Sequence, residues 1–223
     1  MSKQGFLQLF RPAHKVPQTI WSSDRPLNVR PKLSTIFALV LGLWIFGTGE
    51  AILIGARIGV SPWTVLAQGI SEQTSFTVGL STLFVGVMVL LLWIPLRETP
   101  GIGTISNIII ISLSIDVMGP FVSEQTILLS QIIQALIGII FVAIGSALYL
   151  TANLGPGPRD GWMTGIQKRT GWPIGRVRAG IELSVLAIGI FLGGTFGLGT
   201  VMFALGIGPI LAICLGIVKK WSF

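Results

Sequence analysis

The hydrophobic positions of this chain form long uninterrupted runs instead of alternating with polar ones. Each run approaches the ~20 residues that an α-helix needs to cross a ~30 Å hydrocarbon core. The pattern therefore predicts an all-α, polytopic transmembrane bundle with six spans. The predicted spans are residues 33–54, 76–96, 102–120, 127–151, 174–192 and 198–218.

Composition supports a membrane protein and excludes several other classes. Of the 223 residues, 52% are hydrophobic and 10% are charged, whereas an average soluble domain has about 25% charged residues. The net charge of +7 comes from basic residues that flank apolar runs, which indicates orientation signals and not nucleic-acid binding. With one cysteine, Cys214, and one histidine, His14, we expect no disulfide framework, metal site, cofactor or catalytic residue.

The basic residues also predict the orientation. If the N-terminus is inside, fourteen of the fifteen Lys and Arg lie on the inner side, with Arg57 as the exception. The positive-inside rule then predicts cytoplasmic termini in a bacterial inner membrane. Residues 1–32 form a basic cytoplasmic tail that could contact anionic lipids, with residues 6–11 on the membrane surface. A disordered tail that only enforces orientation explains the same charges.

The chain contains an internal repeat with an offset of 96 residues. Between Gly42 and Thr104, eighteen of sixty-three positions are identical to those 96 residues later, and seven of these are glycine pairs. We therefore divide the chain into the tail, a first repeat at 33–126 and a second repeat at 127–223. Because each repeat has three predicted crossings, the two must insert in opposite directions, as in the inverted repeats of secondary transporters.

Each repeat contains a Gly/Pro-rich element, at residues 54–75 and 150–171. Pro62 and Pro158 are aligned, and each is suited to the first position of a short helix. Helix N-termini suit an anionic or carbonyl-bearing ligand, although the pattern equally fits an interfacial turn followed by a short amphipathic helix. The candidate residues for substrate binding or gating are Gly59, Pro62, Trp63, Thr64, Gly155, Gly157, Pro158, Arg159 and Asp160.

Ionisable residues inside the predicted spans give a second set of candidates, because such residues are costly in a bilayer and usually functional. Glu50, Arg57 and Asp116 are expected in an outer polar cluster. Arg178 and Glu182 are expected in an inner cluster beside Arg159 and Asp160. Alternatively, the i,i+4 spacing of Arg178 and Glu182 makes a structural ion pair, and Glu50 and Asp116 lie near enough to the boundary to be structural.

Four motifs carry a family resemblance: GVSPW at 59–63, WIPLRETPGIGT at 93–104, GPGPRDG at 155–161 and RTGW at 169–172. With them the chain, from Leu33 onward, resembles the YczE-like family of bacterial integral membrane proteins, of the YczE, YyaS and YitT type. The resemblance implies a bacterial inner-membrane protein of similar length. It assigns no catalytic residue.

Three functions are compatible with these patterns. The first is a small secondary transporter or permease for a small polar or anionic solute. The second is a non-transporting accessory protein that docks a cytoplasmic partner through its inner basic surface, which the asymmetry between Arg159-Asp160 and Trp63-Thr64 favours. The third is a membrane enzyme with Asp160 and Glu182 as general acid and base, for which no nucleophile or metal set is present.

Overall fold

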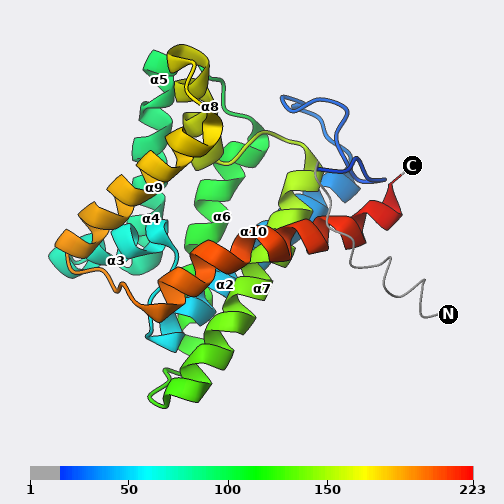
Figure 1. Cartoon of the computed structure of the whole chain (residues 1–223). Coiled ribbons are helices and arrows are strands. Elements are labelled where there is room, and N and C mark those ends of the chain that lie inside the picture. The colour runs from blue at the N-terminus through cyan, green and yellow to red at the C-terminus, as the bar shows by residue number, and fades with distance from the viewer. Residues whose placement is uncertain (1–15, 223) are drawn as a thin grey trace, which may run out of the picture.

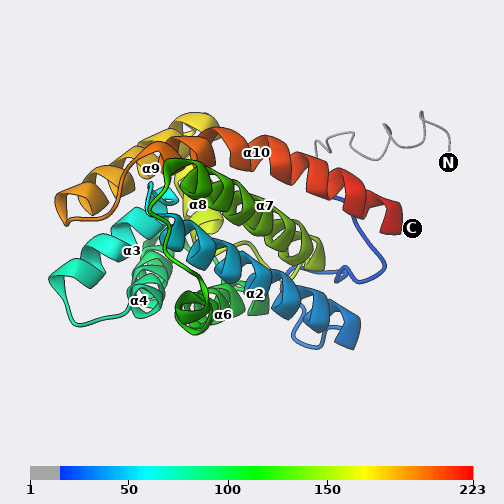
Figure 2. The same ribbon diagram turned by 90° about the horizontal axis from the view of Figure 1, so that it is seen from below.

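The computed structural model describes residues 16–222, and that part of the chain contains helices and turns but no strand (Figures 1 and 2). The all-α prediction is therefore confirmed, while the prediction for residues 6–11 lies outside the described residues. The elements are α2 (Leu33–Ala56), α3 (Pro62–Gln73), α4 (Val78–Leu91), α5 (Trp93–Leu96), α6 (Ile102–Met118), η1 (Gly119–Phe121), α7 (Leu128–Ala152), α8 (Pro158–Thr170), α9 (Ile174–Phe191), α10 (Leu198–Val218) and η2 (Lys219–Trp221).

Five helical stretches within residues 16–222 are long and apolar enough to cross a membrane: Leu33–Ala56, Val78–Leu96, Ile102–Phe121, Leu128–Ala152 and Leu198–Val218. Each matches one of the predicted spans. The chain is therefore a multi-pass integral membrane protein. Helix α9 occupies the remaining predicted span, residues 174–192, but its first turns carry Arg176, Arg178 and Glu182. A sixth crossing stays a prediction.

Helices α2 and α7 pack antiparallel along the middle of the molecule (Figure 2). Gly42 lies against Gly145, and Gly49 lies against Gly138. A Cβ atom on Gly49 would lie 2.8 Å from the carbonyl oxygen of Gly138, so only glycine permits this approach. Since Gly42 aligns with Gly138 and Gly49 with Gly145, the two contacts exchange under the 96-residue offset.

The chain leaves α2 and α7 through similar turns, which we call the first break (residues 57–61) and the second break (residues 153–157). Arg57 and Asn153 both adopt left-handed conformations, with φ of 57° and 52°. Gly59 and Gly155 follow with φ of 107° and 112°, which glycine adopts without strain. The aligned residues thus form the same backbone turn.

Each break is bound by the other half of the chain. The N–H of Gly199, at the start of α10, donates to the carbonyl of Ile58 at 2.7 Å, and the N–H of Gly103, at the start of α6, donates to the carbonyl of Leu154 at 2.7 Å. Each short helix also packs against helices of the other half: α3 packs against α9, and α8 packs against α4 and α5. These contacts make the two halves interdependent.

The third helices of the two halves differ in their surroundings. Helix α6 packs between α2 and α4, whereas α10 packs mainly on α7 and crosses in front of it in Figure 1. Much of α10 is exposed, including 73% of Leu205. A lipid-facing surface of this kind suits a bilayer and not water.

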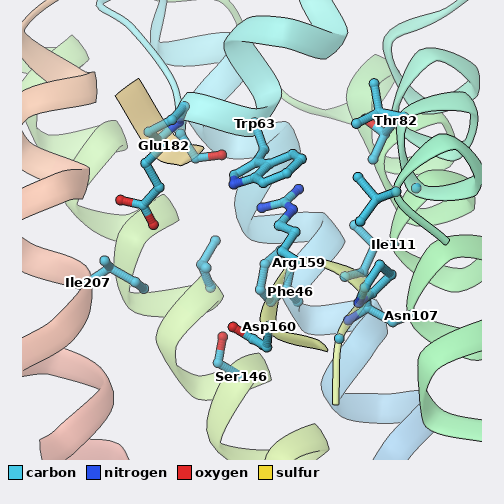
Figure 3. Close-up of a pocket in the computed structure, with 18 of the residues that line it drawn as sticks. Phe46, Trp63, Thr82, Asn107, Ile111, Ser146, Arg159, Asp160, Glu182 and Ile207 are labelled. Carbon is cyan, nitrogen blue, oxygen red and sulfur yellow. The ribbon is translucent and has the colours of Figure 1, made fainter. Parts of the chain in front are cut away.

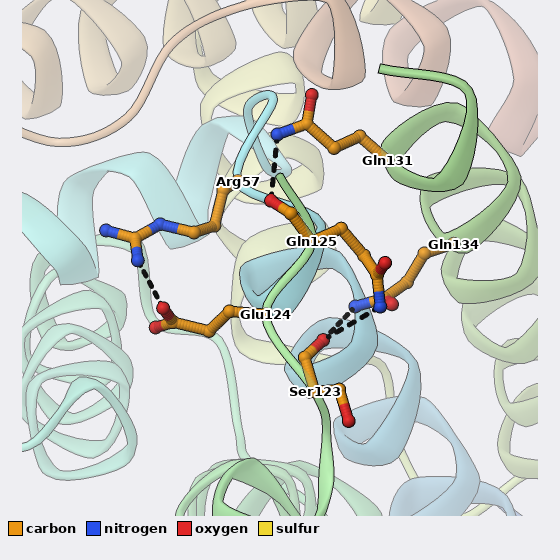
Figure 4. Close-up of polar contacts among 6 residues, drawn as sticks. All are labelled: Arg57, Ser123, Glu124, Gln125, Gln131 and Gln134. Carbon is orange, nitrogen blue, oxygen red and sulfur yellow. Dashed lines mark hydrogen bonds and ion pairs between the residues drawn. The ribbon is translucent and has the colours of Figure 1, made fainter. Parts of the chain in front are cut away.

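A covering segment lies against each break. Residues 119–127 cover the end of α2, where Gln125 N donates to Gly55 O. The Gln134 side chain of α7 donates to Ile52 O and also to Ser123 O of this segment, and Figure 4 shows the second contact. Residues 16–32 cover the end of α7, where Ser23 N donates to Ala152 O at 3.0 Å and Trp21 Nε1 donates to Thr151 Oγ1 at 3.1 Å.

Candidate functional site

A cavity of about 350 Å³ lies where α3 and α8 begin, and both halves of the chain line it (Figure 3). Its apolar wall comes from α4, α6 and α10, with side chains such as Val89, Ile111 and Phe203. Its polar groups gather at the starts of the two short helices and on α9. The predicted candidates that line it are Pro62, Trp63, Gly157, Pro158, Arg159, Asp160, Arg178 and Glu182.

The N-termini of α3 and α8 both reach this cavity. Ser61 and Gly157 are their N-cap residues, and neither helix has a side-chain cap. The first backbone N–H groups that donate to the carbonyls of these N-cap residues are those of Val65 and Gly161. The preceding turn of each helix therefore presents N–H groups and partial positive charge at the cavity, an arrangement suited to an anion.

Arg159 supplies a full positive charge beside these helix ends. Its guanidinium carbon lies 4.8 Å from the ring centroid of Trp63, within the range of a cation–π interaction. Trp63 and Arg159 occupy the same repeat position, 96 residues apart. Burial lowers the pKa of Arg159, and the carboxylates of Glu50 and Asp160 oppose that shift. No carboxylate forms an ion pair with Arg159 in residues 16–222.

The remaining charges on the cavity wall belong to Asp160, Arg178 and Glu182. Arg178 Nε donates to Glu182 Oε1 at 2.9 Å, which is the i,i+4 pair that the sequence suggested. Their side chains are 57% and 33% exposed. Burial raises the pKa of Asp160, and the positive charges of Arg178 and Arg159 act in the opposite direction. The wall thus carries charges of both signs.

Glu50 lies behind the start of α3 and is 1% exposed. Its Oε2 accepts hydrogen bonds from Thr64 Oγ1 at 2.8 Å and from Ser61 Oγ at 3.2 Å. Its Oε1 is buried and has no hydrogen-bond partner among the described residues. Ser61 is the N-cap residue of α3, but its hydroxyl binds this carboxylate and does not cap the helix.

Glu50, Arg57 and Asp116, expected in one outer polar cluster, have three different sets of partners. Arg57 forms an exposed ion pair with Glu124 of the covering segment (Figure 4). Asp116 accepts hydrogen bonds from Thr77 Oγ1 at 2.5 Å and from the N–H of Gly79 at 2.8 Å. The three residues therefore do not form one cluster, because the two carboxylates accept hydrogen bonds from nearby donors and Arg57 donates to Glu124.

Three other candidates support the cavity without lining it. Gly59 and Gly155 form the turns of the two breaks, and Thr64 hydrogen-bonds Glu50. Sequence reasoning missed several polar lining residues, namely Asn107, Ser146 and Tyr149. The chain has one tyrosine, so a single phenol within a predicted span was the available signal. Within residues 16–222, no group of three or more His, Cys, Asp or Glu side chains could hold a metal ion.

The long apolar helices define a polytopic helical membrane protein. Residues 33–216 match the model of DUF6198, a family of unknown function, and the chain belongs to that family. The prediction of a YczE-like protein is confirmed.

Three curated relatives are similar over most of their length. An uncharacterized protein of Haemophilus influenzae is 41% identical over 205 residues, which cover 92% of this chain and 93% of the relative. The uncharacterized membrane protein YczE of Bacillus subtilis is 31% identical over 78% of this chain and 82% of its own length. YyaS of the same organism is 26% identical over 81% of this chain and 92% of its own length. No solved structure matches significantly.

Proposed function

We propose that the chain is a small secondary transporter that carries a small polar or anionic solute through the cavity. The observation that carries this proposal is the convergence of two helix N-termini and one partly buried arginine on a single cavity. Backbone N–H groups and a guanidinium recognise anionic oxygens without fixing the rest of the solute. The apolar wall leaves room for a hydrocarbon portion.

The exchanged contacts of the two halves support an inverted repeat as the framework of transport. Antiparallel α2 and α7, matched breaks and reciprocal hydrogen bonds are expected of halves related by an axis in the membrane plane. Such repeats can rock against each other around a central site. In this proposal α9 is the sixth crossing, and both termini are on the cytoplasmic face of the inner membrane.

Cysteine labelling of intact cells tests the topology. In a Cys214→Ser background, single cysteines at Ser123 and Thr195 should react with an impermeant maleimide from outside. Cysteines at Thr99 and Lys168 should not react, and all four positions are exposed. Labelling of Thr195→Cys only after the cells are opened would contradict the six-span arrangement.

Ligand binding tests the function. The purified protein should be screened by thermal unfolding against short carboxylates, phosphate and sulfate, each beside a cationic ammonium salt of similar size. Arg159→Gln should weaken binding of a stabilising anion by about 10- to 100-fold, because a charge-assisted hydrogen bond contributes about 1.5–3 kcal/mol. The matched control is Arg169→Gln, an exposed arginine at the end of the same helix.

Two results would reject this assignment: stabilisation by the ammonium salts alone, or equal affinity in both arginine variants. A stabilising anion should next be tested for uptake into proteoliposomes. The docking alternative loses part of its support, because Arg159 and Asp160 line the cavity and are only partly exposed.

A further inference from the structure

We propose that Glu50 is a proton-binding site, and that it exchanges its proton with the cavity through the hydroxyl of Ser61. The role as a coupling site rests on the proposed transport function, whereas proton binding itself does not. Glu50 is set apart from the other acids by its burial and by its partners, which are Ser61 in the first break and Thr64 on α3.

One oxygen of the Glu50 carboxylate has no hydrogen-bond partner among the described residues. Its Oε2 is occupied by two hydroxyl donors, while Oε1 is buried without a partner among the described residues. A carboxylate oxygen enclosed in this way is strongly disfavoured as an ion, and such groups commonly take up a proton. A proton needs no additional space, which suits a residue that is 1% exposed.

Ser61 provides the route from Glu50 to water. Glu50 does not line the cavity, but Ser61 does. Ser61 Oγ lies 3.2 Å from Glu50 Oε2 and 2.9 Å from Thr64 Oγ1, which itself lies 2.8 Å from Oε2. A proton from cavity water can bind the Ser61 oxygen while the Ser61 hydroxyl proton moves to Glu50. The net result is one proton transferred and an unchanged serine.

The charges near Glu50 decide what its protonation changes. The hydroxyls of Ser61 and Thr64, at the start of α3, donate to Glu50. Asp116 of α6 is bound to Thr77 and Gly79, and the phenol of Tyr149 on α7 lies beside Asp160. The opposite charge that acts on Glu50 is Arg159 of α8. Protonation of Glu50 therefore removes one of the negative charges that act on Arg159 and favours the binding of a solute anion there.

Alignment of the halves sharpens this assignment. Glu50 aligns with Ser146 and Thr64 aligns with Asp160, so each half holds one acid and one hydroxyl at these positions, in opposite places. Ser146 and Asp160 both line the cavity, whereas Glu50 is separated from it by Ser61. Only the acid of the first half requires a relay.

Infrared difference spectroscopy tests the proposal on the full chain in vesicles of phosphatidylethanolamine and phosphatidylglycerol. Acidification should produce a carboxylic acid C=O band that Glu50→Gln removes and Glu50→Asp shifts in position. The matched control is Asp116→Asn, another acid in a predicted span with two hydrogen-bond donors, and it should leave this band in place. Ser61→Ala should slow the exchange of the acid proton for deuterium at least several-fold.

The proposal is overturned if the band persists in Glu50→Gln, or if Glu50→Asp, used when the glutamine variant does not fold, leaves its position unchanged. Loss of the band on adding Na⁺ at constant pH would also overturn it, because the site would then bind a metal cation. Unchanged exchange in Ser61→Ala would remove the relay. The anion screen on the same samples reports the transport proposal separately, since proton binding needs no solute.

Discussion

The first and second breaks share a backbone but differ in chemistry. Both turns pair a left-handed residue with a positive-φ glycine, and both accept a 2.7 Å hydrogen bond from the third helix of the other half. Beyond the shared proline, the first continues with Trp63 and Thr64, and the second with Arg159 and Asp160. Duplication thus preserved the scaffold, while side-chain substitution moved charge to one side of the cavity.

The difference has a physical explanation. The turns require glycine at positive φ and close backbone contacts, so these glycine positions tolerate almost no substitution. Of the positions after the prolines, Trp63, Arg159 and Asp160 line the cavity, where several side chains fit. The comparison teaches that the repeat identities report folding constraints, and that the mismatches within the breaks are the better guide to function.

The largest expected effect is on the shared turns. Gly59→Val and Gly155→Val should each destabilise the protein by about 3 kcal/mol, through strain at positive φ and a clash with the other half. A Cβ would lie 2.6 Å from Gly197 N in the first case and 2.9 Å from Thr104 Oγ1 in the second. Thermal unfolding in detergent measures both.

Gly175→Ala is the control for these variants, since a Cβ there meets nothing within 4 Å and α9 should gain about 0.5–1 kcal/mol in helix propensity. If only one break tolerates valine, the breaks are not structurally equivalent.

The contact between the breaks should give an intermediate effect. Trp63→Leu and Arg159→Gln each remove the cation–π pair, which contributes about 0.5–2 kcal/mol. A double-mutant cycle on unfolding free energies should therefore return a coupling of about 1 kcal/mol, whereas Trp63→Phe should retain most of it. Additive single effects would show that the two aligned residues act independently.

The covering segments should give a smaller and local effect. Trp21→Phe removes the donor to Thr151, and the loss of one hydrogen bond corresponds to about 0.5–1.5 kcal/mol. Hydrogen exchange should accelerate several-fold at residues 153–157 and stay unchanged at 57–61. Gln134→Met, which removes the donor to Ile52, should do the opposite. Acceleration of both breaks by either variant would contradict independent covering.

The smallest expected effect concerns the exposed pair on α9. Arg178→Glu combined with Glu182→Arg should change stability by less than about 0.5 kcal/mol, because partly exposed i,i+4 pairs contribute little. If the pair takes part in solute recognition, the folded swap should bind its stabilising anion more weakly. Unchanged anion binding would leave the helix N-termini and Arg159 as the recognition groups.

Much of the fold could be predicted because the signals were local. The apolar runs located the helices, and Pro62 and Pro158 located the starts of α3 and α8. The i,i+4 spacing identified the pair between Arg178 and Glu182. The partners of the residues expected in the outer polar cluster could not be predicted, because Asp116 accepts a hydrogen bond from α4 and Arg57 pairs with Glu124 on a covering segment.

The sequence by itself determined the helical class, the membrane location and the repeat register, since apolar length and glycine position are properties of single segments. Tertiary structure decided which sides of the helices meet. Apolar residues surround these helices on every side, so periodicity does not distinguish a lipid-facing side from a packed one. Only the tertiary structure placed the start of α3 beside Glu50 of α2 and Arg159 of α8 beside Trp63, with Ser61 and Arg159 on the wall of one cavity.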